Sequence, residues 1–172
     1  MTKGKLTNVI GDVTNPQFTG ENEVAIIPHC CNDLGMMGAG VALALRKKWP
    51  SIFDSYHAMV MGHRNRQLQC LGKITYINVE ENITVFNMIG QHGIVDEDNP
   101  KPVKYTALVD AMREVSAYIS IMRMQNPEKK YVVHTPQFGS ALAGGKWELI
   151  IELIQEIWIE NGIDVVVYEF GK

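Results

Sequence analysis

Short runs of apolar and β-branched residues, each bounded by turn-forming or charged residues, recur along the chain and predict β-strands. The predicted strands cover residues 6–10, 24–28, 73–79, 83–89, 131–134 and 163–170. Apolar residues at helical spacing predict helices over 41–48, 51–61, 103–124 and 147–160. This alternation is typical of an α/β fold in which helices cover both faces of a mixed or mostly parallel sheet, with one clear hairpin turn at 79–84.

Polar segments rich in glycine directly follow three of the predicted strands. The first strand is followed by GDVTNP, the second by HCCNDLGMMGAGV and the fifth by TPQFGSALAGGKW. Ligands of open α/β sheets bind outside the carboxyl ends of the strands, so these segments are expected to meet at one rim of the sheet. A long polar connection at 90–102, GQHGIVDEDNPKP, follows the fourth strand, and such loops are typically functional or mobile.

Two of these segments lead directly into predicted helices, and both are candidates for anion binding. Their small residues are Gly35, Gly38, Gly40, Gly139, Ser140, Gly144 and Gly145. A backbone without Cβ atoms can approach a ligand closely, and the N-terminus of a helix adds partial positive charge. Two such loops at one rim predict that linked phosphates are held by backbone amides. The alternative is that the glycines only permit tight turns into the helices.

The motifs of the common nucleotide-dependent enzymes are absent from both loops. The fingerprint G-x-G-x-x-G does not occur, because Gly38-Ala39-Gly40 is followed by Val41, Ala42 and Leu43. The Gly145-Lys146 pair is followed by Trp147 and not by the Ser or Thr of a P-loop. A nicotinamide-dependent oxidoreductase and an ATPase are therefore disfavoured.

Length and composition predict a single soluble domain over residues 1–172. The chain is 46% hydrophobic and 20% charged, and 172 residues suffice to bury a core. A net charge of -3 disfavours general nucleic-acid or anionic-membrane binding, so an anionic ligand has to be held locally. The basic residues Arg46, Lys47, Lys48, Arg64 and Arg66 are accordingly interpreted as a solvated face and not as an RNA-binding patch.

Cysteine usage and the N-terminal sequence predict a cytoplasmic location. Three cysteines give no disulfide framework, no apolar leader is visible, and no window approaches the ~20 apolar residues of a membrane span. Cys30 and Cys31 lack an arginine six positions later, so the C-x5-R signature of cysteine phosphatases is missing. Zinc binding by His29, Cys30 and Cys31 is disfavoured because adjacent ligands seldom point at one metal. We expect no metal and no cofactor.

The three segments after the strands resemble the macrodomain family, whose members bind ADP-ribose and its derivatives. GDVTNP, HCCNDLGMMGAGVALALRKKWP and PQFGSALAGGKW occur in the order and spacing of that family, and the resemblance covers nearly the whole chain. It implies a three-layer α/β/α sandwich with a central mixed sheet of about six strands. The HxxN opening followed by KKWP is similar to the branch containing yeast-type ADP-ribose-1″-phosphate phosphatases and glutamyl-ADP-ribose deacylases.

The resemblance implies binding roles at matching positions. Asp12 would accept a hydrogen bond from the adenine amino group, Asn32 would contact the distal ribose, and Phe170 or Tyr168 would pack on the adenine. Asp12 could instead cap a turn and Asn32 form an Asx-turn, while the Met36-Met37 pair could line the distal ribose or pack under the loop. The residues implied to bind the ligand are Gly11, Asp12, Val13, Thr14, Asn32, Met37, Gly38, Ala39, Gly40, Val41, Pro136, Gln137, Phe138, Gly139, Ser140, Ala141, Leu142 and Ala143.

The two catalytic schemes of this branch fit the sequence unequally. The deacylases use a lysine after the fourth strand and an aspartate in the second glycine loop, where this chain has Gln91 or His92 and Ala143. To take the role of the deacylase lysine, Lys101 or Lys104 would have to be brought into the site by a flexible loop.

The phosphatases use a histidine at the position of His29, and an imidazole with a pKa near neutral can protonate a leaving alkoxide or orient a water. A buried core histidine is the alternative. We therefore predict an ADP-ribose-1″-phosphate phosphatase with His29 and Asn32 as catalytic candidates. The acidic partner stays open among Asp33, Asp96, Glu97 and Asp98, with His92 as a further candidate. The other possibilities are a non-catalytic ADP-ribose reader and a hydrolase that removes ADP-ribose from protein or nucleic acid.

Overall fold

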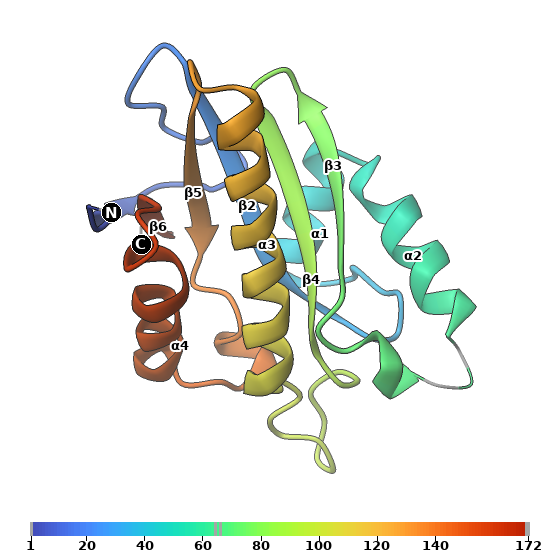
Figure 1. Ribbon diagram of the computed structural model, residues 1–172. Coiled ribbons are helices and arrows are strands. Elements are labelled where there is room, and N and C mark those ends of the chain that lie inside the picture. The colour runs from blue at the N-terminus through green and yellow to red at the C-terminus, as the bar shows by residue number, and fades with distance from the viewer. Residues whose placement is uncertain (1, 64, 66, 171–172) are drawn as a thin grey trace.

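The computed structural model describes residues 2–63, 65 and 67–170, and within them one sheet of six strands lies between two layers of helices (Figure 1). The strands are β1 (Leu6–Ile10), β2 (Glu23–Asn32), β3 (Ile74–Glu80), β4 (Ile83–Gln91), β5 (Lys130–Pro136) and β6 (Val165–Glu169). The helices are α1 (Gly40–Lys48), α2 (Ile52–Gly62), α3 (Tyr105–Gln125) and α4 (Trp147–Ile154). Short helical turns cover Gln67–Cys70 and Ala141–Ala143, and the π-helical turn Gln155–Ile159 extends α4.

The strands lie in the order β1-β6-β5-β2-β4-β3, and every neighbouring pair is parallel except the β3–β4 hairpin. In Figure 1 the arrow of β5 accordingly points down and that of β3 points up. The predicted mixed α/β sheet is confirmed. Because five strands run in one direction, the loops that follow β1, β2, β4, β5 and β6 all start from the same rim of the sheet.

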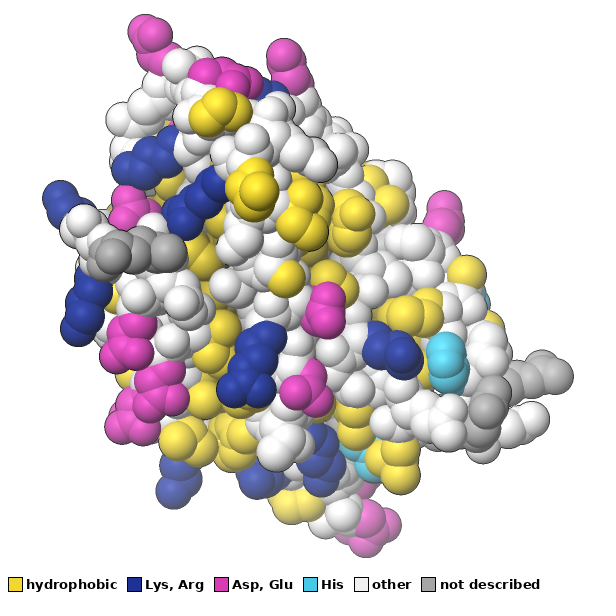
Figure 2. All heavy atoms as spheres, in the orientation of Figure 1, with side chains coloured by type: hydrophobic (Ala, Val, Ile, Leu, Met, Phe, Trp, Pro, Cys, Tyr) yellow, Lys and Arg dark blue, Asp and Glu magenta, His cyan; other side chains and the backbone are white. Residues whose placement is uncertain are grey.

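Each face of the sheet packs against its own pair of helices, which confirms the predicted three-layer sandwich. Along β2 the pleat alternates, so that Ile26 joins the core under α3 and α4 whereas Ile27 joins the core under α1 and α2. Each core contains a large, fully buried aromatic side chain, Trp158 on the first face and Tyr56 on the second. Figure 2 shows basic, acidic and apolar side chains interspersed over the outer face of α3 and α4.

Strand β2 is longer than the sequence predicts, and this changes where the candidate residues lie. The prediction ended at residue 28, but pairing with β4 continues through His29, Cys30 and Cys31 to Asn32, with a register shift at the last step. The segment HCCN therefore belongs to the end of a strand and not to the loop after it. Alternation then sends successive side chains to opposite faces.

A chain of buried hydrogen bonds fastens the segment that follows β1 to the sheet. The backbone N–H of Gln17 donates to the Tyr168 hydroxyl (2.8 Å), which lies 2.7 Å from Nδ1 of His134. Nε2 of His134 lies 2.8 Å from a carboxylate oxygen of Glu23, and the other oxygen accepts from Thr19. Burial lowers the pKa of His134, although the Glu23 contact opposes the shift. A neutral ring satisfies both neighbours if Nε2–H donates to Glu23 and Nδ1 accepts from Tyr168.

The basic residues in the last turn of α1 lie on the surface, as the sequence suggests. The Arg46 guanidinium stacks on the Phe53 ring at 3.7 Å from its centroid, and the Lys48 ammonium lies 5.9 Å from the Trp49 ring centroid. Arg64 and Arg66 lie outside the described residues. None of the helices in the described part of the chain has the length and hydropathy needed to span a bilayer.

The bend after β5 requires glycine at position 139, and substitution there provides a test of the fold. Gly139 has φ +74°, and a Cβ atom would lie 2.8 Å from Cδ1 of Ile150. Gly139→Ala is expected to lower the free energy of unfolding by about 1–3 kcal/mol in urea denaturation, through left-handed backbone and crowding. Gly20→Ala, where nothing lies within 4 Å of the added Cβ, is the matched control and should have a near-normal midpoint. Equal midpoints for the two variants would contradict this packing.

Candidate functional site

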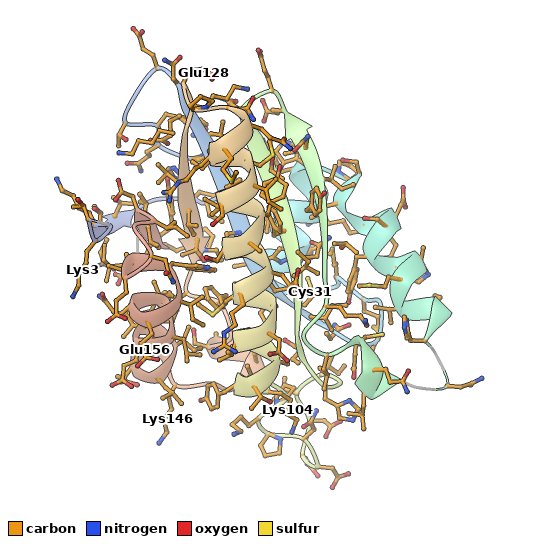
Figure 3. All side chains as sticks on the ribbon, viewed as in Figure 1. Lys3, Cys31, Lys104, Glu128, Lys146 and Glu156 are labelled. Carbon is orange, nitrogen blue, oxygen red and sulfur yellow. The ribbon has the colours of Figure 1, made fainter. Side chains whose placement is uncertain are left out.

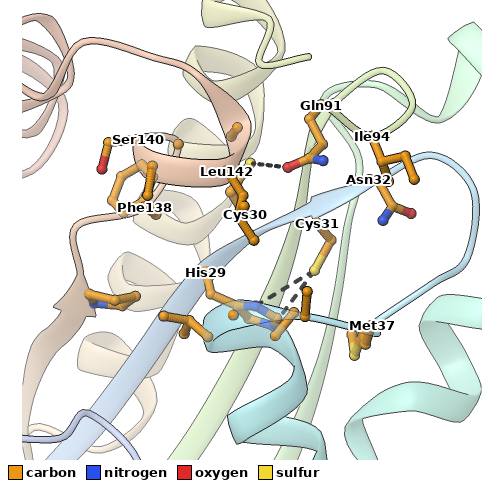
Figure 4. A pocket seen from close by; sticks show the side chains of 18 of the residues that line it. His29, Cys30, Cys31, Asn32, Met37, Gln91, Ile94, Phe138, Ser140 and Leu142 are labelled. Carbon is orange, nitrogen blue, oxygen red and sulfur yellow. Dashed lines mark hydrogen bonds between the residues drawn. The ribbon is translucent and has the colours of Figure 1, made fainter. Parts of the chain in front are cut away.

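A pocket of about 470 Å³ opens at the rim where β2, β4 and β5 end. It is lined by the end of β2, by the loop into α1, by the loop after β5, and by Gln91, Ile94 and Val95 after β4. Figure 4 shows Ser140 and Leu142 on one side and Asn32, Gln91 and Ile94 on the other. The predicted binding residues that line it are Asn32, Met37, Gly38, Ala39, Gly40, Val41, Pro136, Gln137, Phe138, Gly139, Ser140, Ala141, Leu142 and Ala143.

The N-terminus of α1 forms one wall of this pocket and carries no cap. Ala39 at the N-cap has no side chain that could accept from the first turn, and the first turn contains no acidic residue. Gly40, Val41 and Ala42 all line the pocket, and the first N–H groups of a helix have no intrahelical acceptor. Unsatisfied donors at the positive end of a helix make this wall suited to an anion.

The loop after β5 forms the opposite wall and meets the first. The Leu142 side chain lies over Gly40, with its Cδ1 3.4 Å from the position that a Cβ atom would take. Ala141 has φ +54° and is the one non-glycine residue with positive φ in the described ranges 2–63, 65 and 67–170. The Ser140 hydroxyl donates to the Gln137 carbonyl (2.7 Å), which ties the start of the loop together. The expected convergence of the two glycine loops is present in the structure.

His29 lies at the floor of the pocket, and its ring is buried. Nε2 is 2.6 Å from Oδ1 of Asn87, whose amide nitrogen donates to the Ile52 carbonyl and the Thr75 hydroxyl. The amide oxygen of Asn87 is thus the acceptor, and His29 donates through Nε2–H. Burial lowers the pKa of His29 to about 4, opposed by the Asn87 hydrogen bond. The expectation of a near-neutral pKa is therefore wrong, and a neutral imidazole is a poor general acid.

Asn32 shapes the loop that leads to α1. Its Oδ1 accepts from the Leu34 N–H (3.0 Å) and the Tyr56 hydroxyl (2.7 Å), and its Nδ2 donates to the Met36 carbonyl (2.9 Å). The alternative of an Asx-turn is the arrangement observed. Met37 packs under the loop with 1% of its surface exposed, whereas Met36 is 51% exposed, and both line the pocket. Contact of Met36 with a distal ribose stays a prediction.

Neighbouring thiols and amides on the pocket floor are uncharged. Burial raises the pKa of Cys30 to about 12 and also raises the pKa of Cys31, so neither is a thiolate at neutral pH. The Gln91 amide donates to the Gly93 carbonyl (3.0 Å). No group of three side chains able to hold a metal occurs within the described portion of the sequence.

The adenine-side candidates lie on the same rim but outside this pocket. Oδ1 of Asp12 accepts from the Thr14 N–H (2.9 Å) and hydroxyl (2.8 Å), which matches the turn-capping alternative for Asp12. Val13 is buried in the core under α1 and α2, and Gly11 lies over the Tyr168 ring. Tyr168 is 4% exposed and belongs to the buried network, so of the two aromatic candidates only Phe170, which is 62% exposed, is accessible to a base.

The candidate acidic partners of His29 have other contacts. Asp33 is fully buried, and its two oxygens accept from Nδ1 of His92 (2.6 Å) and from the Gly93 N–H (2.8 Å). Asp96 caps a turn through the N–H groups of Asp98 and Asn99. None of Asp33, His92, Asp96, Glu97 and Asp98 lines the pocket.

The lysines near the site also lie outside the pocket. Lys104 precedes α3, and Figure 3 places it at the lower end of the molecule. The Lys101 ammonium lies over the Tyr105 ring, 5.0 Å from its centroid. Within the described chain, the pocket lining contains no Lys, Arg, Asp or Glu, and Lys101 and Lys104 do not line it.

Comparison with known proteins identifies the family. No protein-family model matches the chain. The structure of a macrodomain protein from Streptomyces coelicolor has 35% sequence identity and a TM-score of 0.74, covering 97% of this chain and 100% of that one. The chain belongs to the macrodomain family.

Two further relatives of this macrodomain are informative. A protein of unknown function from Bacteroides thetaiotaomicron is 36% identical, with a TM-score of 0.80 and coverage of 96% of this chain and 98% of that one. A curated ADP-ribose 1″-phosphate phosphatase from Scheffersomyces stipitis is 21% identical over 91% of this chain and 96% of its own length.

The buried neutral ring of His29 makes stability depend on pH. Below about pH 6.5 the unfolded chain binds a proton that the folded chain excludes down to about pH 4, so the free energy of unfolding falls across that window. The expected loss is on the order of 3 kcal/mol. Urea denaturation of the wild type and of His29→Gln at several pH values measures it, and the variant should have the flatter profile. Parallel profiles would show that the ring is not held neutral.

Proposed function

We propose that this macrodomain binds ADP-ribose and holds its diphosphate between the N-terminus of α1 and the loop after β5. The observation that carries the proposal is the uncapped, acid-free first turn of α1, whose residues line a pocket closed on the other side by a second glycine loop. Such a wall supplies amide donors for an anion without any lysine or arginine. The name of the Scheffersomyces stipitis relative supports the same ligand class.

The strand order supports one direction for the ligand along the rim. Asp12 and Phe170 follow β1 and β6, the two glycine loops follow β5 and β2, and Gln91 ends β4. An extended ligand with its adenine at Asp12 then has its diphosphate between the two loops. Its distal ribose reaches the end of the pocket formed by Asn32, Gln91 and Ile94.

A charge placed at the N-cap of α1 tests this binding mode. Ala39 is exposed and extended, with φ -154°, so Asp fits there and would accept from the first-turn N–H groups. We expect Ala39→Asp to keep or raise the melting temperature while weakening ADP-ribose binding at least about 10-fold by calorimetry. Ala39→Asn, which has a similar shape and no charge, should lose less affinity. Full affinity in the Asp variant would place the diphosphate elsewhere.

A second candidate function is hydrolysis of ADP-ribose-1″-phosphate, supported by the name of the curated relative and by His29 on the pocket floor. The low pKa of His29 weighs against it, because the ring is neutral at neutral pH, a neutral imidazole is a poor general acid, and its Nε2–H is engaged with Asn87. Because the described pocket lining also contains no Lys, Arg, Asp or Glu to assist phosphoryl transfer, binding without turnover is the function that the site supports best. A non-catalytic ADP-ribose-binding protein of this kind would have ADP-ribosylated macromolecules as its binding partners.

Incubation with ADP-ribose-1″-phosphate decides between reading and hydrolysis. We expect phosphate release no faster than in a protein-free blank. Release that falls at least about 10²-fold in His29→Gln, while ADP-ribose affinity is kept, would assign the phosphatase activity and a catalytic His29. Release of free ADP-ribose from modified protein or nucleic acid would assign the macromolecular hydrolase instead.

A further inference from the structure

The end of the pocket beyond the glycine loops carries no charge. The titratable groups of the pocket lining in the described chain are His29, Cys30 and Cys31. The ring is neutral because burial lowers its pKa, and the thiols are neutral because burial raises theirs. This end therefore differs from the α1 wall, where the helix terminus supplies positive potential.

The side-chain amides at this end are already engaged within the protein. Nδ2 of Asn32 donates to the Met36 carbonyl and Nε2 of Gln91 donates to the Gly93 carbonyl. The oxygen of Asn32 accepts from Tyr56, and that of Gln91 faces the Cys30 thiol at 3.9 Å. Both amide nitrogens therefore donate within the loops, and neither is free to replace the water that hydrates a second phosphate.

The mouth above this end is apolar. Met36, Ile94, Val95 and Leu142 all line the pocket, and each keeps between 44% and 54% of its surface exposed. They come from three different loops, after β2, β4 and β5, so they form a collar around the opening and not a stripe on one element. Exposed apolar side chains that converge on a pocket are typical of a contact surface for a ligand.

We propose, on the basis of the proposed function, that the distal end accepts ADP-ribose whose C1″ is free or joined to an uncharged group, and discriminates against the 1″-phosphate. A phosphate there would lose water without gaining a cation or a free amide side chain. An uncharged substituent with an apolar face would instead extend from C1″ through the collar. Its contact with the collar side chains would remove apolar surface from water. The ligand class is therefore ADP-ribose conjugated through C1″ to a neutral group.

Competition calorimetry with three defined ligands tests the proposal. ADP-ribose, its 1″-O-benzyl glycoside and ADP-ribose-1″-phosphate share the adenine and the diphosphate and differ only at C1″. We expect the benzyl glycoside to bind at least as tightly as ADP-ribose, and the 1″-phosphate to bind at least about 10-fold more weakly. A 1″-phosphate that binds as tightly as ADP-ribose would overturn the inference and leave the proposed function standing. Absence of ADP-ribose binding would overturn both.

A cation added to the collar supplies the converse test. Ile94→Lys should narrow the affinity gap between ADP-ribose and its 1″-phosphate by at least about 5-fold, because it gives the phosphate a partner. Ile94→Gln controls for the lost apolar surface, and Met124→Lys, at an exposed position of α3 that does not line the pocket, controls for net charge. Both controls should keep the wild-type gap. An Ile94→Lys variant that folds and also keeps the gap would show that the C1″ group does not reach the collar.

Discussion

The site of this macrodomain depends on the backbone N–H groups that begin α1 and have no acceptor within the helix. Their position follows from the sheet, because β2 delivers the chain to the rim and the loop through Gly40 turns it back into the helix. An alanine at the N-cap leaves these donors free for a ligand. A sequence with the usual Ser, Thr or Asp there would have a better capped helix and a weaker anion site.

Two buried carboxylates, those of Glu23 and Asp33, fix the segments that follow β1 and β4. Glu23 anchors Thr19 and, through His134 and Tyr168, the backbone of Gln17. Asp33 holds the first two residues of the loop after β4. Because each carboxylate accepts several hydrogen bonds, its burial is compensated and its loop is fixed. The segments that follow β1 and β4 are thus each tied to a buried carboxylate.

The sequence predicted the elements and the converging loops because both depend on local pattern: apolar period, glycine spacing and the break into helix. It did not predict that HCCN lies within β2, because the polar His29 and Asn32 interrupt the apolar pattern and the strand conformation of this segment comes from pairing with β4. The protonation state of His29 could not be predicted either, because it also depends on contacts that are distant in the sequence. Its proton position and low pKa depend on Asn87, which is 58 residues away and itself oriented by Ile52 and Thr75.

Ala141 keeps a left-handed backbone in the loop that opposes α1, where glycine would adopt the same angles more easily. A glycine would also visit many other angles, and the loop would have to be ordered each time a ligand arrived. The methyl group restricts that freedom, so the ordering is completed during folding and the local strain is balanced by the packing of the domain. The wall is therefore preorganised, and a ligand held there would cost little loop entropy.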